Sequence, residues 1–357
     1  MRVSKIADLV LERGDPVSQF RIGTMYEFGT VYRKSMRRAV KFYRRAAETG
    51  YSQATFRMAI LHRTGKGVPK DLEASRGYML RAAEAGDTRA QFLSAVDSLF
   101  ICDECEDPEA QVAMMAKAAR SGNADAQTTL GRIYFDGDVV EQDFDTAAKY
   151  LAMAAKSGDP DAHYLLGMMH MEGLGVESDQ DGACGFFMSA SLAGHPGAQY
   201  ELARCYEEGR GVEREIITAL TFYKMAAESG DPDAQGSLGR ILMENGEYRR
   251  ARVWLKRAMK GGDSVATHNL ATMYLRGYGV RKSHRKAAKL LSISAGEGVA
   301  QSMNDLGTLY ARGIGVRKDR DRARSLFQSA AELGVEAAKE NLEMLETTEN
   351  EGFPKKG

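Results

Sequence analysis

The sequence contains few residues whose types and spacing could support chemistry. Cys102 and Cys105 form a CxxC pair within the segment FICDECEDP. A structural zinc site needs four ligands, and one such pair supplies only two of them. The acidic residues around the pair disfavour a reactive thiolate. We interpret the two cysteines as reduced residues of an irregular turn, and a metal or redox role for them stays open.

Two histidines are the next candidates. His163 and His170 lie seven residues apart, which places them on one face of a helix. However, His170 and His62 occupy positions where other segments of the chain have tyrosine, so we interpret both as substitutes for a core aromatic residue. The sequence has no P-loop, HExxH, GxSxG or dinucleotide-binding pattern. We therefore expect no enzyme activity, no cofactor, no bound metal and no small-molecule substrate.

Glycines define the elements that would position any site. The chain has 37 Gly and 7 Pro in 357 residues, and one series of glycines recurs every 36 residues, with a single interval of 32. A fixed period of this length indicates stacked repeats. The series predicts nine repeats between its first and last members: Gly14, Gly50, Gly86, Gly122, Gly158, Gly194, Gly230, Gly262, Gly298 and Gly334.

Each repeat is predicted to hold two helices. Helix B begins near a Ser or Asp, such as Asp71, fifteen residues before the glycine, where its side chain can accept from the first helical turn. It ends at the glycine, which suits a left-handed C′ position. A shorter helix A follows, with a small residue such as Gly131 in its middle and a Tyr such as Tyr134 three residues later. Most copies of helix A end in a Gly-x-Gly-Val turn.

Segments such as DPDAHYLLGMMHMEGLGV, residues 159–176, resemble Sel1-like repeats, which are related to tetratricopeptide repeats. The resemblance covers residues 15–334. It implies an all-α fold, an α/α solenoid in which antiparallel helix pairs form a right-handed superhelix with helix A on the concave side. It also implies an adaptor or scaffold that mediates protein–protein interaction. Repeats 3 and 7 depart from the pattern, because repeat 3 has an altered turn and repeat 7 is four residues shorter.

The ends of the chain are expected to cap this solenoid. We predict one elongated domain over residues 1–346, with a cap helix at 1–14, apolar at Ile6, Leu9 and Val10, nine repeats over 15–334 and a second cap helix at 335–346. Residues 347–357 lack the period and are expected to be disordered. The charged N-terminus does not resemble a signal peptide and no apolar stretch is long enough to span a membrane, so we expect a cytoplasmic protein.

The variable positions of helix A are the candidate binding surface. They lie two, five and six residues after a recurring Leu, and stacked repeats should place them side by side in a groove. Their arginines, acids and methionines suit an unidentified protein or peptide segment, although solvated residues without a partner would give the same pattern. This helix A surface comprises Arg132, Phe135, Met168, Met171, Glu172, Arg204, Glu208, Arg240, Met243, Glu244, Arg276 and Arg312.

A column of aromatic residues has two interpretations. Phe20, Phe56, Phe92, Tyr164 and Tyr200 recur at 36 residues or its multiples. They could form an aromatic ladder for a ligand. The resemblance favours packing between neighbouring repeats instead.

The net charge of zero conceals separate charged zones. Residues 97–215 carry 23 acidic and 8 basic residues, whereas residues 249–324 carry 18 basic and 5 acidic ones. Cations near the start of helix B are disfavoured by the helix dipole, so helix stability does not explain them. The alternative function is thus electrostatic binding of an acidic partner, nucleic acid or anionic membrane, and charge-driven self-association is a further possibility. This basic patch comprises Arg281, Lys282, Arg285, Lys286, Arg317, Lys318 and Arg322.

Overall fold

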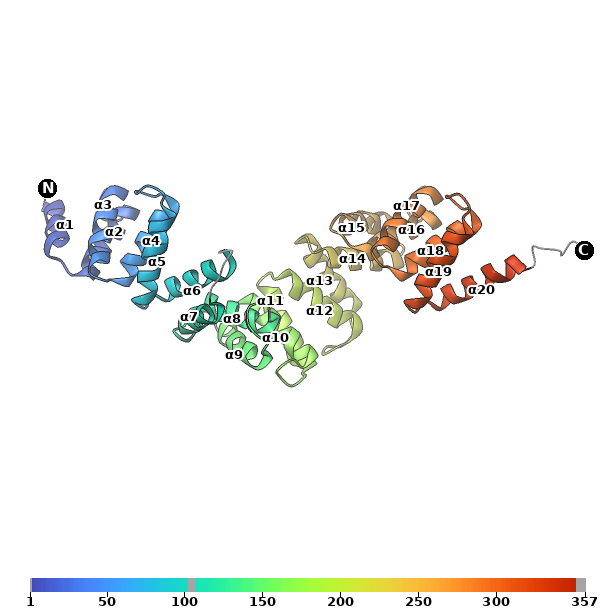
Figure 1. The fold of residues 1–357 in the computed structure, drawn as a ribbon, viewed down its shortest axis with the longest axis horizontal. Coiled ribbons are helices and arrows are strands. Elements are labelled where there is room, and N and C mark those ends of the chain that lie inside the picture. Colours follow the sequence, from blue (N-terminus) through green and yellow to red (C-terminus); the bar gives the residue numbers. More distant parts are fainter. Residues whose placement is uncertain (1, 102–106, 351–357) are drawn as a thin grey trace, which may run out of the picture. The chain divides into compact units, whose positions relative to one another are not determined.

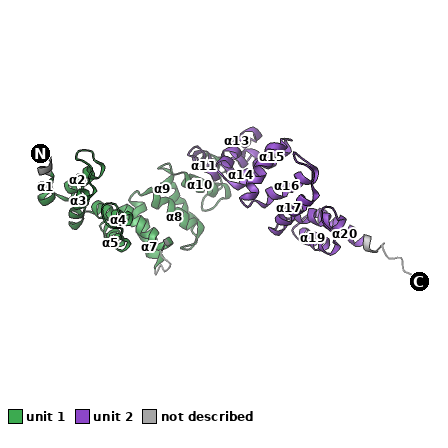
Figure 2. Ribbon diagram, turned by 90° about the horizontal axis from the view of Figure 1, so that it is seen from above, with its two compact units in different colours: residues 1–186 green, residues 187–357 purple. Residues whose placement is uncertain are grey.

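The computed structural model describes residues 2–101 and 107–350, and within these ranges the chain forms helices and no strand. The chain divides into two compact units, residues 1–186 and 187–357 (Figures 1 and 2). Cys102 and Cys105 lie outside the described residues. The expected single domain over residues 1–346 stays a prediction.

The first unit contains ten α-helices and a short π-helix among its described residues. Their bounds are α1 Arg2–Arg13, α2 Pro16–Phe28, α3 Met36–Glu48, α4 Ser52–Thr64, α5 Leu72–Glu84, α6 Thr88–Val96, η1 Asp97–Ile101, α7 Pro108–Arg120, α8 Ala124–Asp136, α9 Phe144–Ala155 and α10 Pro160–Glu172. Helix α11, Gln180–Leu192, contains the boundary between the units.

The second unit continues the same alternation of helices. Their bounds are α12 Pro196–Glu208, α13 Ile216–Glu228, α14 Pro232–Glu244, α15 Tyr248–Lys260, α16 Ser264–Arg276, α17 His284–Gly296, α18 Ala300–Arg312, α19 Arg320–Glu332 and α20 Glu336–Asn350. Even-numbered helices from α2 to α18 are helix A, and odd-numbered helices from α3 to α19 are helix B. From α1 to α10 and from α12 to α20, each helix packs against its neighbours in the chain, which confirms the all-α solenoid class.

The caps explain where the helices begin and end. The Asp71 side chain accepts from Ala74 N at 2.9 Å, and the other Ser and Asp residues at this position cap their helices in the same way. All glycines of the series from Gly50 onward have positive φ, as expected for C′ positions, whereas Gly14 does not. Helix A is as long as helix B, 13 residues in most repeats, so the expectation of a shorter helix A was wrong.

The small residues of helix A let helix B approach closely. A Cβ built on Gly307 would lie 2.7 Å from Cε1 of Phe327. Where an aromatic residue stands sixteen positions later, the tyrosine of helix A stacks on it, as in the Tyr206–Phe222 pair with ring centroids 5.9 Å apart. His62 on Tyr78 and His170 on Phe186 stack in the same way, at 5.4 and 5.2 Å. These contacts confirm that both histidines replace a packed aromatic ring.

The terminal helices differ in detail from expectation. In α1 the buried face is formed by Ala7 with Val10 and Leu11, while Leu9 is 56% exposed, so its assignment to the apolar face was wrong. Helix α20 continues to Asn350, four residues beyond the expected end of the cap, and residues 351–357 lie outside the described part. None of the described helices is long and apolar enough to cross a membrane.

Candidate functional site

The helix A surface of the second unit contains a network of ion pairs. The Arg240 guanidinium on α14 reaches Glu207 on α12 at 2.5 Å and Glu244 on its own helix at 3.0 Å. On α12, Arg204 lies 3.2 Å from Glu201 and 3.6 Å from Glu208. The predicted row of arginines is therefore compensated by carboxylates, and the Arg240–Glu207 pair joins two successive repeats.

Burial and hydrogen bonding set the ionisation of this network. Burial opposes the charge of Glu207, but hydrogen bonds from Tyr223, at 2.7 Å, and from Arg240 outweigh it and lower the pKa of Glu207. Burial, with the neighbouring Glu207, raises the pKa of Tyr223. Burial also raises the pKa of Glu201. Glu207 is thus held as a carboxylate beside the half-buried guanidinium of Arg240.

Glu207 lies at a predicted groove position, five residues after Leu202, but Tyr223 and its pairing with Glu207 were not predicted, although a signal existed. The first unit has the same arrangement, because Tyr43 donates to Glu27 at 2.7 Å and Arg57 pairs with the same carboxylate. In both units the Glu and the Tyr are sixteen residues apart in the sequence. A search for pairs of polar residues that recur at the same spacing in different repeats would have found this pair, whereas a search of single positions did not.

The predicted surface residues of the first unit have diverse environments. Arg132 pairs with Asp161 at 2.9 Å across two helices A, and Phe135 packs edge-on against Phe144 at 5.6 Å. Met168 is half-buried and Glu172 is exposed. Met171 is 7% exposed and belongs to the packed interior, so the structure does not support its role as a surface contact.

The remaining predicted residues lie in the second unit. Met243 is half-buried and packs against the core around Leu242, which leaves only part of its side chain for contact. Arg276 and Arg312, at the ends of α16 and α18, are exposed.

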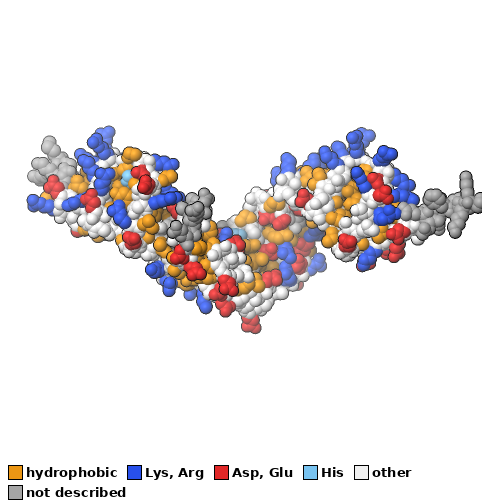
Figure 3. Space-filling view, in the orientation of Figure 1, with side chains coloured by type: hydrophobic (Ala, Val, Ile, Leu, Met, Phe, Trp, Pro, Cys, Tyr) orange, Lys and Arg blue, Asp and Glu red, His pale blue; other side chains and the backbone are white. Residues whose placement is uncertain are grey.

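The basic patch is exposed at every predicted position. Its residues lie in the turns before α17 and α19 and in the first turns of these helices, and Figure 3 shows Lys and Arg side chains over this part of the second unit. Lys286 lies over the Tyr274 ring at 5.5 Å. Arg322 lies over the Tyr310 ring at 5.7 Å and pairs with Asp319 at 3.3 Å. The tyrosines below orient these cations without neutralising them.

A pocket of about 210 Å³ lies between successive helices A of the second unit. It is bounded by α12, α14 and α16. Arg240 joins it to the ion-pair network. Its lining residues are Tyr200, Asp233, Gly236, Ser237, Arg240, Asp263, Val265, Ala266 and Asn269.

One Asp–His–Ser grouping requires a chemical test. His268 Nδ1 lies 2.9 Å from Ser302 Oγ, Ser302 donates to Ser294 Oγ at 2.8 Å, and Ser294 donates to the Ser264 carbonyl at 2.7 Å. A carbonyl can only accept, so both hydroxyl protons point away from the histidine and Nδ1 must be the donor.

This orientation is the reverse of what a histidine base needs to activate a serine. Ser302 and Ser294 are also fully buried. Burial lowers the pKa of His268, while the nearby charge of Asp305 opposes that effect. The grouping therefore joins α16, α17 and α18 structurally. Among the described residues there is no cluster of three or more His, Cys, Asp or Glu suited to a metal ion.

The comparisons with known proteins agree with this architecture. The Sel1 repeat family model matches most of the chain, but residues 88–123, close to the third expected repeat, are not matched. The matched segments are 16–51, 52–87, 124–159, 160–195, 196–231, 232–263, 264–299 and 300–335. Among curated proteins, none matches this chain.

Two solved structures are similar. One is c5321, a protective antigen present in uropathogenic Escherichia coli strains that displays an SLR fold, with 27% identity, a TM-score of 0.87, and coverage of 93% of this chain and 72% of that one. The other is a Sel1 repeat protein from Oxalobacter formigenes, with 26% identity, a TM-score of 0.52, and coverage of 96% and 90%. With eight matched repeats, the chain belongs to the Sel1 repeat family.

Proposed function

We propose that this chain is a non-enzymatic scaffold that binds a protein segment along the helix A surface of its repeats. Sel1 repeats commonly mediate protein–protein interaction. The observation that carries the proposal for this chain is the network on α12 and α14, where Arg204, Glu208, Arg240 and Glu244 are ordered by mutual ion pairs yet remain accessible. Ordered charged groups lose little conformational freedom when a partner binds, so they favour recognition.

A charge reversal on this surface tests the proposal against a matched control. Glu244 ends α14, is 56% exposed, and pairs with the arginine four residues before it. Glu228 ends α13, a helix B, is 58% exposed, and pairs with Lys224 four residues before it. The variants Glu244→Lys and Glu228→Lys therefore make the same change in nearly the same local setting. They differ in that Glu244 lies on a helix A and Glu228 on a helix B.

The measurement is affinity purification of the tagged chain with quantitative mass spectrometry. We expect a partner protein that is retained by the wild type and by Glu228→Lys to be depleted at least tenfold with Glu244→Lys. The affinity of the purified partner for Glu244→Lys should fall to the same extent. Equal retention by both variants, or no protein enriched above the tag alone, would contradict the proposal.

The basic patch supports a second candidate function, binding of an acidic partner, nucleic acid or anionic membrane. Its cations are exposed. Among the contacts described above for this patch, the one ion pair joins Arg322 to Asp319. Anisotropy of labelled DNA and co-sedimentation with phosphatidylserine vesicles would measure it, at salt concentrations from about 50 to 200 mM. Binding that strengthens as salt falls, and that Arg285→Glu with Lys286→Glu weakens, would support this function. Absence of binding at low salt would rule out nucleic acid and membrane.

A further inference from the structure

The pocket between α12, α14 and α16 lies beside Gly236, at a helix A position that five of the nine repeats fill with Phe or Tyr. The fifth residue of helix A is Phe56 in α4, Phe92 in α6 and Tyr200 in α12, whereas α14 has Gly236 at this position. The space that the ring would fill becomes part of the cavity of about 210 Å³. Since one water occupies about 30 Å³ in the liquid, the cavity has room for a planar side-chain head group.

The vacant position brings a carboxylate to the pocket wall. Asp263 caps α16 by accepting from Ala266 N at 2.8 Å through Oδ1. Its other oxygen, Oδ2, lies against Gly236, and a Cβ at that glycine would collide with it. Burial and, to a smaller extent, the neighbouring Asp233 raise the pKa of Asp263.

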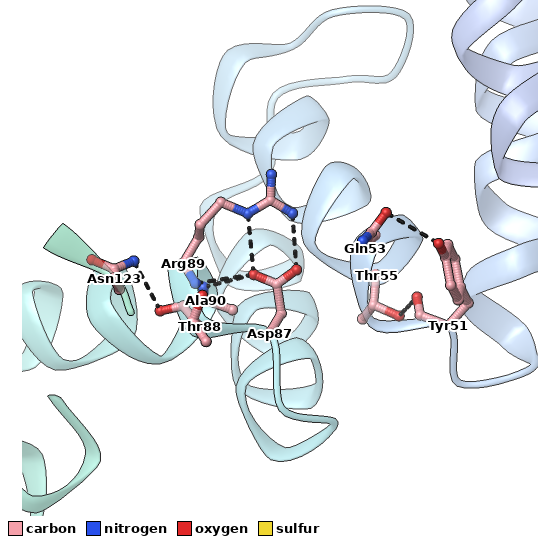
Figure 4. Close-up of polar contacts among 8 residues, drawn as sticks. All are labelled: Tyr51, Gln53, Thr55, Asp87, Thr88, Arg89, Ala90 and Asn123. Atoms are coloured by element: carbon pink, nitrogen blue, oxygen red, sulfur yellow. Dashed lines mark hydrogen bonds and ion pairs between the residues drawn. The ribbon is translucent and has the colours of Figure 1, made fainter. Parts of the chain in front are cut away.

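The same chain shows what this carboxylate position can hold. Asp87 caps α6 as Asp263 caps α16, and it binds the guanidinium of Arg89, with Nη2 at 2.9 Å from Oδ2 and Nε at 3.4 Å from Oδ1 (Figure 4). The guanidinium lies over the ring of Phe56 at 4.4 Å. A guanidinium is thus held between a capping carboxylate and the aromatic ring of the preceding helix A.

In the second unit the acceptor is kept but the cation is absent. Val265 stands where Arg89 stands in α6, and Gly236 stands where Phe56 stands in α4. Tyr200, Asp233 and Asn269 complete the lining. Arg240 also borders the pocket, but its guanidinium is bound to Glu207 and Glu244, so it leaves the aspartates uncompensated.

We propose that this pocket receives the guanidinium group of an arginine side chain from a protein partner. The proposal rests on the scaffold function and specifies what the helix A surface recognises. The guanidinium would pair with Asp263 and Asp233 and lie against the Tyr200 ring, as Arg89 lies against Phe56. Its planar shape fits the slot left by the missing ring, which a lysine ammonium would fill less well.

An NMR titration of the full chain with short peptides tests this assignment. The probe is acetyl-Gly-Arg-Gly-amide, and its controls carry lysine or citrulline, a neutral analogue of arginine. We expect saturable shifts at the backbone amides of Gly236, Ser237 and Asn269, with a millimolar dissociation constant for the arginine peptide and at least tenfold weaker binding of the citrulline peptide. Equal binding of the two peptides, or no saturable shift, would overturn the proposal.

Two variants with a matched control make the test specific. Asp263→Asn keeps a good capping residue but removes the charge, and should weaken binding at least tenfold. Asp231→Asn makes the same change at the cap of α14, which does not line the pocket, and should leave binding unchanged. Val265→Arg, at a position 54% exposed, should fill the pocket from within and abolish binding. Wild-type affinity of both Asp263→Asn and Val265→Arg would refute the proposal.

The outcomes separate this inference from the scaffold function. A partner that loses affinity for Glu244→Lys but binds Val265→Arg as it binds the wild type would leave the scaffold function standing and refute the arginine pocket. Specific binding of the arginine peptide, sensitive to both pocket variants, would support the pocket even if the Glu244→Lys experiment recovered no protein.

Discussion

The close approach of helix B to the glycine of helix A predicts opposite effects for the same substitution at two sites. Gly307 lies in the middle of α18, and an added Cβ would lie 2.7 Å from Cε1 of Phe327, which is 2% exposed. Gly77 lies in the middle of α5, with nothing within 4 Å of an added Cβ. Replacing glycine by alanine in a helix gains about 1 kcal/mol. Overpacking a core costs about 1–3 kcal/mol.

We therefore expect Gly77→Ala to stabilise its repeat by about 1 kcal/mol and Gly307→Ala to destabilise its repeat by about 1 kcal/mol net. Repeats can open separately, so the measurement is native-state hydrogen exchange of α5 and of α18–α19, together with urea unfolding of the whole chain. Equal stabilisation by both substitutions would refute the claim that helix contact requires Gly307.

A double-mutant cycle identifies the contact responsible. In the eighth repeat the corresponding positions hold Ala271 and Leu291, both fully buried in one cluster. Phe327→Leu alone should cost about 1 kcal/mol, since it removes volume from the core. Combined with Gly307→Ala it recreates the Ala–Leu pair, so the two changes should be coupled favourably by about 1 kcal/mol. Additive effects would show that the Cβ–ring contact does not cause the destabilisation.

Further predictions concern the polar groups. Tyr223→Phe should raise the pKa of Glu207 toward its ordinary value of 4.5 and cost about 1 kcal/mol, measured by NMR titration and urea unfolding. Because the folded-state pKa of Glu207 is lowered, the ionised carboxylate contributes to the free energy of unfolding above the unfolded-state pKa, and this contribution is lost as pH falls through the folded-state pKa. The stability lost in Tyr223→Phe should therefore shrink in acid, and a loss that is the same at every pH would contradict the assignment. Asp305→Asn should move the pKa of His268 further below 6.5, because the aspartate charge opposes the effect of burial, and a rise seen by histidine NMR would refute this. Ser302→Ala should cost about 1–3 kcal/mol, since it leaves His268 Nδ1 and Ser294 without their shared partner, whereas an unchanged unfolding midpoint would exclude the proposed hydrogen-bond chain.

Features that repeat along the chain could be predicted from the sequence. The glycine series fixes where each helix B ends, because only glycine readily adopts the positive φ found at Gly50 and its successors. Likewise, His62 and His170 could be assigned to the core because they share a register with tyrosines. Such features arise from the packing within one repeat, which every copy must satisfy.

Features that break the period could not be predicted in this way. Met171 shares its register with Glu207, but an apolar side chain turns into the core, while Glu207 stays at its edge to meet Tyr223 and Arg240. A column of sequence positions therefore does not define one surface. The pocket was also missed, because it is lined by Gly236 of one helix A and by Asp263 at the cap of the next, which no single column of the sequence brings together.

The distribution of charge in the second unit follows from the same local pairings. The arginines on α12 and α14 are compensated by Glu201, Glu207, Glu208 and Glu244, so the uncompensated charge near the pocket is that of Asp233 and Asp263. The basic patch lies on the turns before helices B and carries the opposite sign. Charges of this kind are screened beyond about 10 Å at 0.1 M salt, so a partner responds to each surface separately. The two binding modes should thus separate in one protein, because Val265→Arg blocks only the arginine peptide, while reversal of Arg285 and Lys286 affects only acidic ligands.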